Sequence, residues 1–245
     1  KNFNLIINLV KNIFRKKGYS LVKNAQGYID ANQIIADASK ENISIHDLLE
    51  KNFDDLKKGR RERIISKMKE YNCFDNISTV LEIGAGTAMF LEKVIQFSKE
   101  ISYEVYETDI NWCDFIKRKY INEIQNLIIR NADGISLSST ADSSINLVHS
   151  HAVFVYLPVI NIYSYLKECS RVVKNGGYIV FDVISDIGFT PEVANEWINQ
   201  NYRFAVITPH QFIMDFSSEN SLECVTFFDE YYAGSTSRYY ILKKI

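Results

Sequence analysis

From residue 79 onward, short apolar runs alternate with longer segments in which apolar residues recur at helical spacing. Short apolar runs between turn residues predict buried strands, whereas a 3.6-residue period predicts amphipathic helices. Alternating strands and helices are typical of an open α/β sheet. The expected strands are 79–84, 102–108, 126–130, 145–149, 178–184, 222–231 and 237–243, and the expected helices are 87–98, 111–120, 158–173 and 209–217.

The first 75 residues show helical spacing without strand-like runs. Ser44, followed by Asp47 three residues later, is a typical start of a helix. We therefore expect a helical N-terminal extension or cap at 1–75 and a sheet domain at 76–245. The helices expected in the extension are 3–14, 28–38, 44–53 and 57–71.

Two segments interrupt the pattern of the sheet domain. Asn175-Gly176-Gly177 is expected to cap helix 158–173 and to turn the chain. Residues 185–207 are irregular and rich in aromatic side chains, and we interpret them as an insertion that covers a ligand site. Packing of an extra helix at about 191–199 explains the same aromatic residues equally well.

The composition is that of an ordinary globular protein. The chain has 245 residues, with 47% hydrophobic and 24% charged residues, which is enough to bury a full core. No run of 18 apolar residues exists, so no membrane span is expected. The four cysteines are isolated, which predicts no metal site and favours reduced thiols in a cytoplasmic protein.

The net charge of −2 argues against general nucleic-acid binding. The charge is uneven, because residues 1–75 hold 15 Lys and Arg against 10 Asp and Glu, whereas residues 76–245 hold 13 against 20. This basic extension favours an anionic ligand. Its cluster of basic residues is either a solvated helix face with acidic partners or a site for a carboxylate or phosphate. The cluster consists of Lys57, Lys58, Arg60, Arg61 and Arg63.

Residues 82–88, which read EIGAGTA, form the most distinctive segment. They follow an expected strand and precede an expected helix, so glycine lets the backbone approach a ligand closely. A dinucleotide fingerprint needs a third glycine where this chain has Met89. Glu82 would repel a pyrophosphate but would hold an ammonium group. The segment therefore predicts a cationic ligand without phosphate.

The segment resembles the first motif of class I S-adenosylmethionine (SAM)-dependent methyltransferases, an acidic residue followed by G-x-G-x-G. It departs from that motif only at the last glycine, which is Ala88. The resemblance implies a Rossmann-like sheet of seven strands, the last one antiparallel, with helices on both faces. It also implies SAM as the cofactor and S-adenosylhomocysteine as the product. The methionine end would be held by Glu82, Gly84, Ala85 and Gly86.

Two acidic positions agree with this resemblance. An acid about 20 residues beyond the glycines can accept both ribose hydroxyls; Asp109, followed by Ile110, matches best, and Glu107 is a second candidate. Alternatively, Asp109 merely caps the next helix. In the family an Asp after the third strand accepts the adenine amino group, and Asp133 occupies that place between Ala132 and Gly134. An ordinary Asx turn is the alternative for Asp133.

Three residues near the end of the fourth strand are candidates for catalysis, and one of them, His149, is also a candidate for cofactor binding. His149 and His151 are two apart on an extended chain and would face the same way. Histidine can act as a general base towards a hydroxyl acceptor, although packing is as good an explanation for His151 and a better one for His149. Tyr156 is expected to line the site more than to react. Asn146 replaces the Asp that the family usually has in this strand.

We therefore predict an O-methyltransferase for a small anionic or sugar- or nucleotide-linked acceptor. A weaker resemblance to bacterial methyltransferases of capsules and surface polysaccharides rests on residues 231–239 and the helical extension, and it makes a phosphoramidate one conceivable acceptor. An N-methyltransferase, a non-catalytic SAM-binding subunit and, with less support, a nicotinamide-dependent oxidoreductase are the alternatives. The extension is interpreted as a lid or as a contact in a homodimer.

Overall fold

The computed structural model describes residues 30–53, 56, 58–98, 100–200, 202, 206–232 and 235–245. The chain divides into two compact units, residues 1–30 and residues 31–245. The second unit contains the sheet together with the helices that immediately precede it. The division expected at residue 75 therefore stays a prediction, and the helix expected at 3–14 lies outside the described residues.

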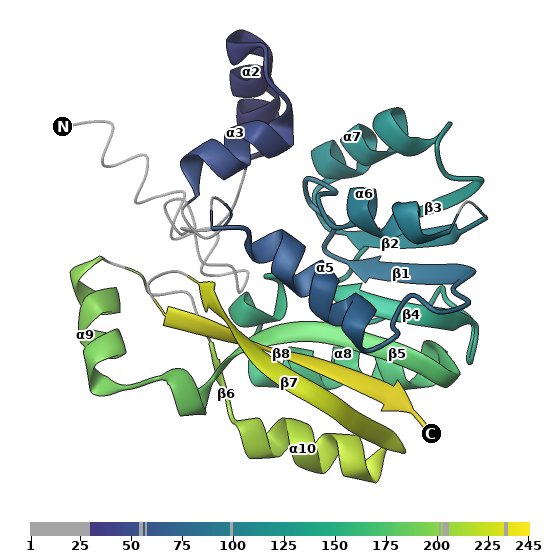
Figure 1. Ribbon diagram of the computed structural model, residues 1–245, viewed down its shortest axis with the longest axis vertical. Helices are drawn as coiled ribbons and strands as arrows, with labels where there is room; N and C mark the ends of the chain where they lie inside the picture. Colours follow the sequence, from purple (N-terminus) through teal and green to yellow (C-terminus); the bar gives the residue numbers. More distant parts are fainter. Residues whose placement is uncertain are drawn as a thin grey trace, which may run out of the picture. The chain divides into compact units, whose positions relative to one another are not determined.

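A mixed β-sheet forms the centre of residues 31–245 (Figure 1). Its strand order is β3-β2-β1-β4-β5-β8-β7, and the two-residue strand β6 pairs with β5 beside this path. The strands from β3 to β5 are parallel, whereas β8 is antiparallel to both of its neighbours. This confirms the expected seven-stranded sheet. The strands are β1 (Thr79–Ile83), β2 (Ser102–Glu107), β3 (Asn126–Asn131), β4 (Ile145–Ser150), β5 (Val173–Ser185), β6 (Ile207–Thr208), β7 (Leu222–Tyr232) and β8 (Ser235–Lys244).

Helices cover both faces of the sheet, as expected (Figure 1). One face packs against α5 (Arg60–Glu70), α6 (Leu91–Val94) and α7 (Ile110–Tyr120), and the other packs against α8 (Val159–Val172) and α10 (His210–Glu219). The remaining helices are α2 (Ala31–Glu41), α3 (Ile45–Asn52) and α9 (Pro191–Asn199), with short 3-10 turns η1 (Ile95–Phe97), η2 (Phe154–Tyr156) and η3 (Asp186–Gly188). Ser44 caps α3 as expected, because its side chain accepts a hydrogen bond from the Asp47 N–H.

Alternation along the strands places polar side chains under α5. Side chains of successive strand residues point to opposite faces. On β1, Val80 packs in the core beneath α5, α6 and α7, whereas Leu81 and Ile83 pack on the α8 side. Glu82 therefore shares the face of Val80. The same alternation puts His149 of β4 and other buried polar residues on this face, where they form the site described below.

The helix expected at 87–98 is shorter than predicted. A loop continues through residue 90 before α6 begins at Leu91, and the 3-10 turn η1 completes the segment. The φ angles of Gly86 and Ala88 are +49° and +62°, which a right-handed helix does not allow. The glycine-rich segment therefore stays a loop for longer than its apolar spacing indicates.

The prediction that residues 175–177 cap a helix is wrong, because they lie inside β5. The pairing of β5 with β4 shifts in register between Ile145 and Leu147. A Cβ at Gly177 would lie 2.8 Å from the carbonyl oxygen of Asn146. Glycine thus permits a close approach of the two strands at an irregular point of the ladder, instead of ending the helix.

Candidate cofactor site

The glycine-rich loop leaves β1 with two glycines that have different surroundings. Gly84 has φ +70°, its N–H donates to the Tyr106 carbonyl at 2.7 Å, and a Cβ there would lie 2.4 Å from Cγ2 of Val153. Gly86 has φ +49°, and a Cβ there would meet no described atom within 4 Å. Gly84 is therefore needed for packing within the protein, whereas Gly86 leaves backbone open to a ligand.

The carboxylate of Glu82 lies within the sheet. Its side chain is 2% exposed, and its Oε2 accepts a hydrogen bond from the Tyr103 hydroxyl at 2.8 Å. Burial raises the pKa of Glu82 to about 8; the Tyr103 hydrogen bond opposes this shift, and the nearby charge of Glu107 adds to it. A carboxylate with so little hydration is stabilised in its charged form by a cation, so it suits an ammonium group.

Two carboxylates lie at the end of β2, and they make different contacts. Glu107 accepts hydrogen bonds from the N–H groups of Gly86, Thr108 and Asp109 at 2.8, 2.7 and 2.9 Å. Asp109 caps α7 by accepting from the Asn111 N–H, as the alternative interpretation expected. Ile110 follows with 63% of its surface exposed. Glu107 is thus the acid in direct contact with the glycine-rich loop.

Asp133 lies in the loop after β3 and forms the Asx turn that was the alternative interpretation. Its Oδ1 accepts from the N–H groups of Ile135 and Ser136 at 2.9 and 2.7 Å, and its Oδ2 accepts from the Ser136 hydroxyl at 2.6 Å. Burial acts to raise the pKa of Asp133, but the hydrogen bonds from Ser136 and Ile135 outweigh it and hold the pKa below its ordinary value. The turn leaves Asp133 exposed beside the half-buried Ala132 and Gly134.

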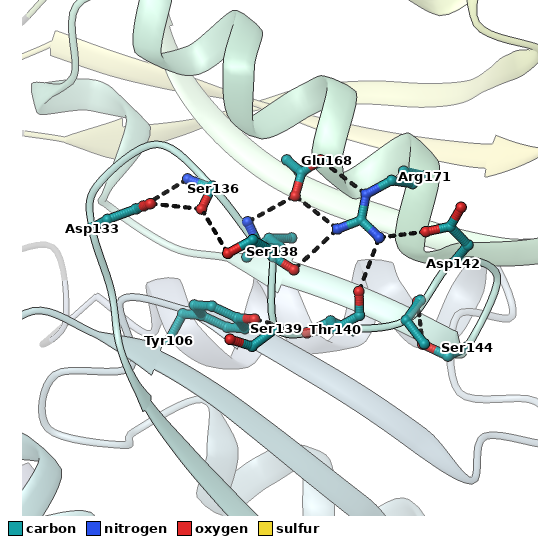
Figure 2. A network of polar contacts seen from close by, with 12 residues as sticks. Tyr106, Asp133, Ser136, Ser138, Ser139, Thr140, Asp142, Ser144, Glu168 and Arg171 are labelled. Carbon is teal, nitrogen blue, oxygen red and sulfur yellow. Dashed lines mark hydrogen bonds and ion pairs between the residues drawn. The ribbon is translucent and has the colours of Figure 1, made fainter.

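Figure 2 shows how the loop that carries Asp133 is attached to α8. Arg171 donates to both carboxylate oxygens of Glu168 at 2.9 and 2.7 Å, to the carbonyls of Leu137 and Thr140, and to Asp142. Glu168 in turn accepts from the Leu137 N–H at 3.0 Å. One guanidinium group therefore fixes residues 137–142 to the helix, and through them the position of Asp133.

We expect the substitution Arg171→Met to loosen this loop. Hydrogen bonds to charged groups contribute roughly 1.5–3 kcal/mol each when buried, but Arg171 is partly exposed, so we expect a total loss of about 1–2 kcal/mol in the free energy of unfolding. The affinity for S-adenosylhomocysteine should fall by roughly fivefold. Urea unfolding and calorimetry measure the two effects. Lys167→Met, an exposed change on the same helix, is the control, and equal effects of both variants would contradict this role.

His149 and His151 face the same way, as expected, and they contact each other. Nδ1 of His149 lies 3.1 Å from Nε2 of His151, and the side chains are 0% and 8% exposed. Burial lowers the pKa of His149 to about 3 and lowers that of His151 well below its ordinary value, where His149 and Arg60 act in the same direction. The ring of Phe90 stacks on His151 with centroids 3.5 Å apart. Both histidines are therefore neutral, buried members of a hydrogen-bonded layer.

Tyr156 belongs to an aromatic cluster above the ends of β4 and β5. It is half-buried, and its hydroxyl makes a short hydrogen bond with the Tyr232 hydroxyl. Residues of the 185–207 segment join this cluster: Trp197 of α9 lies with its ring 5.1 Å from that of Phe189 and 5.3 Å from that of Tyr202. The segment therefore contributes packed aromatic rings beside Tyr156, which agrees with both interpretations offered for it.

The arginines of the expected basic cluster have acidic partners. Arg60 binds Asp182 at 3.0 Å, Arg61 binds Glu50 and Glu62 at 3.0 Å, and Arg63 binds Glu230 at 2.6 Å. Lys58 lies over the Tyr231 ring at 4.7 Å, and Lys57 lies outside the described residues. These contacts support the interpretation with acidic partners, but Arg60 and Arg61 are buried, so this face is not solvated as expected. Of the expected partners Asp54, Asp55 and Glu62, Glu62 is confirmed and the other two lie outside the described residues.

The extension also contacts the glycine-rich loop. His46 of α3 is buried, with Nε2 3.0 Å from the carbonyl oxygen of Thr87 and Nδ1 2.5 Å from Oε2 of Glu92 on α6. Sequence reasoning missed this contact, since a lone histidine in a helix carries no signal of a distant partner. It also missed Asp182, although an acid within an expected buried strand is a signal in itself.

Other kinds of site are not indicated by the described residues. In this part of the chain no group of three or more His, Cys, Asp and Glu side chains could hold a metal ion. The four cysteines are free thiols. Among the helices that the structure describes, none is long and apolar enough to cross a membrane.

The acidic groups on and just after the parallel strands β1, β2 and β3 match the chemistry of SAM. The carboxylates of Glu82, Glu107 and Asp133 suit an ammonium group, ribose hydroxyls and an adenine amino group, and none of these requires a basic partner. The exposed Ile110 offers an apolar surface beside Glu107. The strand order and the antiparallel β8 are those of the class I SAM-dependent methyltransferase fold.

Comparisons with known proteins lead to the same class. The family model described as "Methyltransferase domain" matches residues 81–181. No match was found among curated protein sequences. The comparisons therefore identify a methyltransferase domain with the fold of the class I SAM-dependent enzymes, for which SAM is the cofactor.

Solved structures share the fold at low sequence identity. Magnesium protoporphyrin IX methyltransferase from Synechocystis PCC 6803, solved with S-adenosylhomocysteine, has a TM-score of 0.60 at 10% identity, over 78% of this chain and 86% of that one. Geranyl diphosphate C-methyltransferase from Streptomyces coelicolor has a TM-score of 0.58 at 12% identity, over 75% and 80%. A SAM-dependent methyltransferase from Methanosarcina mazei has a TM-score of 0.56 at 14% identity, over 72% and 96%.

Proposed function

We propose that this methyltransferase methylates a hydroxyl oxygen of a small acceptor that is anionic or linked to a sugar or nucleotide. The observation that carries the cofactor part is the contact between Glu107 and the Gly86 N–H, which joins a carboxylate to the open glycine backbone. In this proposal Glu82, Gly84, Ala85 and Gly86 hold the methionine end. Bound SAM supplies a methyl group on a sulfonium, which an acceptor oxygen can attack directly.

The proposed ribose and adenine contacts lie at the ends of the neighbouring strands β2 and β3. We assign the ribose to Glu107 or Asp109, the two carboxylates at the end of β2, and the adenine amino group to Asp133. Ile110, Ala132 and Gly134 lie next to these acids in the chain and would line the base. This assignment is supported by the exposure of Ile110 and by the small side chains at residues 132 and 134.

The acceptor is assigned to the region of Tyr156. Tyr156 is half-buried and lies in the aromatic cluster formed with the 185–207 segment, so it is well placed to orient an acceptor. His151 and His149 lie deeper, and their ring nitrogens already contact other groups. In this arrangement the histidines pack beneath the proposed acceptor site and do not react. The enzyme then works mainly by positioning the acceptor next to the methyl group.

The anionic character of the acceptor has one supporting observation, the excess of basic residues in 1–75. Arg61 and Arg63 bind carboxylates and so offer it no support. A capsule precursor and a phosphoramidate remain specific candidates within this proposal. N-methylation of a small molecule and a non-catalytic subunit that binds SAM are the alternatives.

Calorimetric binding of S-adenosylhomocysteine, with NADH as the comparison ligand, tests the cofactor site. We expect 1:1 binding of S-adenosylhomocysteine and no binding of NADH, because the site offers carboxylates where a pyrophosphate needs donors. Loss of binding in Glu82→Ala would support the ammonium contact. Binding of NADH alone would contradict the assignment.

An acceptor screen then separates the remaining alternatives. Radiolabelled methyl transfer to sugars, nucleotide sugars, phosphoramidates and amines, followed by mass spectrometry, distinguishes O- from N-methylation. A protein that binds S-adenosylhomocysteine but modifies no member of the screen would favour the non-catalytic subunit.

A further inference from the structure

A chain of buried hydrogen bonds extends from Glu82 across the sheet beneath α5. The Tyr103 hydroxyl lies 2.8 Å from Oε2 of Glu82 and 2.7 Å from Nε2 of His149. Nδ1 of His149 lies 3.1 Å from Nε2 of His151. Glu82, Tyr103 and His149 are each at most 2% exposed, so water does not compete for these contacts.

The other end of this chain is held by Arg60. Nδ1 of His151 lies 3.4 Å from the Tyr239 hydroxyl, and Nη2 of Arg60 lies 3.3 Å from the same oxygen. Arg60 also binds Oδ2 of Asp182 at 3.0 Å, and both side chains are buried. Arg60 belongs to the helix that precedes the sheet, so the chain joins that helix to the cofactor acid.

The hydrogen bonds between these groups can all run in either of two directions, from donor to acceptor. A hydroxyl and a neutral imidazole each have one hydrogen to donate, and burial keeps both histidines neutral. An ionised Glu82 only accepts, so Tyr103 donates to it, and His149 and His151 both carry their hydrogen on Nε2. A protonated Glu82 reverses every link and places both hydrogens on Nδ1. The two tautomers therefore report the ionisation of Glu82.

One state converts into the other when each hydrogen moves along its own hydrogen bond. When Glu82 ionises, its proton passes to Tyr103, and the Tyr103 proton passes to Nε2 of His149. The proton on Nδ1 of His149 then passes to Nε2 of His151, and the proton on Nδ1 of His151 passes to Tyr239. Tyr239 is itself buried and gives up its own proton at this end of the chain. The ionised state therefore holds one proton fewer in total, which the solvent takes up in a titration, and each side chain between the ends keeps its charge.

We propose that Arg60 is a positioning residue for Glu82, and that it acts through this chain to favour the state in which Glu82 is ionised and both histidines carry their hydrogen on Nε2. Arg60 can only donate, and its positive charge beside the Tyr239 oxygen favours loss of a proton at that end. The ammonium group of the cofactor favours the same state from the Glu82 end. This inference rests on the proposed contact between Glu82 and the cofactor.

Other charges limit the size of the effect. Glu107 on β2 raises the pKa of Glu82, and Tyr120 of α7 is coupled to Glu82 by charge. Tyr103 and His149 also contact Glu82, and both are neutral. At the far end, Asp182 offsets part of the charge of Arg60. We therefore expect Arg60 to change the pKa of Glu82 by about one unit, which corresponds to a tenfold change in an equilibrium constant.

Nitrogen-15 NMR of the histidine rings in the full chain tests the proposal, because the protein has only four histidines. In a titration of the free protein we expect His149 and His151 to change together from Nδ1–H to Nε2–H, with a midpoint near the pKa of Glu82 at about 8. S-adenosylhomocysteine should produce the same change at neutral pH and release about one proton.

Variants of α5 then test the part played by Arg60. We expect Arg60→Gln to raise the midpoint by about one pH unit and to weaken S-adenosylhomocysteine binding about tenfold at pH 7. Arg60→Lys keeps the charge and should restore most of both. Arg63→Gln, on the same helix but bound to Glu230, is the control and should leave the midpoint unchanged. Tyr239→Phe removes the connecting hydroxyl and should also raise the midpoint, which provides a test if Arg60→Gln fails to fold.

Fixed tautomers throughout the titration, or equal midpoints in Arg60→Gln and Arg63→Gln, would overturn the proposal. A further outcome distinguishes the failure of this proposal from the failure of the proposed function. If pH changes the tautomers as expected but S-adenosylhomocysteine does not bind, the chain and its control by Arg60 stand, and the cofactor contact of Glu82 is wrong.

Discussion

Replacing Gly84 with alanine is expected to destabilise the protein by about 3 kcal/mol and to abolish measurable binding of S-adenosylhomocysteine. A left-handed backbone costs an alanine roughly 1–2 kcal/mol, and overpacking adds roughly 1–3 kcal/mol. Both apply here, because φ is +70° and the new Cβ would lie 2.4 Å from Cγ2 of Val153. Urea unfolding gives the change in stability, and calorimetry gives the change in binding.

Gly86→Ala is the matched control, because this position is strained but not crowded. Its φ is +49°, and a Cβ would meet no described atom within 4 Å, so the expected loss of stability is only about 1 kcal/mol. Cofactor affinity should still fall at least tenfold if a ligand approaches this backbone. The double variant Gly84→Ala, Val153→Ala should recover part of the stability. Equal losses for the two glycine variants would mean that contact with Val153 is not the cause.

Glu107→Gln is expected to weaken S-adenosylhomocysteine binding by about 100-fold, which is roughly 2.7 kcal/mol. Glu107 accepts hydrogen bonds from three backbone N–H groups. The side-chain NH2 group of glutamine is a donor, so it would face some of these N–H groups and could not accept a hydrogen bond from them. The carboxylate would also be lost as an acceptor for ribose hydroxyls. Calorimetry with the folded variant, checked by circular dichroism, measures this effect.

Asp109→Asn distinguishes the two candidate acids. Asparagine caps a helix as well as aspartate does, so α7 should keep its stability. If Glu107 is the main ribose contact, Asp109→Asn should change affinity by less than about fivefold. A larger loss of affinity for Asp109→Asn than for Glu107→Gln would instead identify Asp109 as the ribose contact, in agreement with the family pattern.

The strands were predictable because burial on both faces leaves a plain signal. β1 and β4 are short, mostly apolar runs between turn residues, and β2 combines Tyr and Val with two glutamates. The predicted bounds of all three differ from the observed ones by two residues or fewer. β6 has only two residues and carries no such signal. β5 begins five residues before the predicted start, since the glycine pair at 176–177 is typical of turns and gives no sign of an irregular strand pairing.

The acids that we propose to bind the cofactor could be identified as candidates one by one, but their partners could not. A run that ends in Glu107 and Asp109 identifies both acids as candidates, whereas the choice between them depends on which side chain reaches Gly86 across the loop. Likewise, His149 and His151 were expected to face the same way, but their partners Tyr103 and Tyr239 come from strands far apart in the sequence. Sequence spacing gives directions within one strand and carries no information about such contacts.

The placement of the two tryptophans gives the protein a pair of internal optical probes. Trp112 lies in α7, two residues after the exposed Ile110, and its ring packs edge-on against Phe115. Trp197 lies in α9 among the aromatic rings near Tyr156. Fluorescence of a Trp197→Phe variant would come from the cofactor edge alone, and that of a Trp112→Phe variant from the 185–207 segment alone. Binding at the proposed cofactor site and at the proposed acceptor site could thus be followed separately in one unlabelled protein.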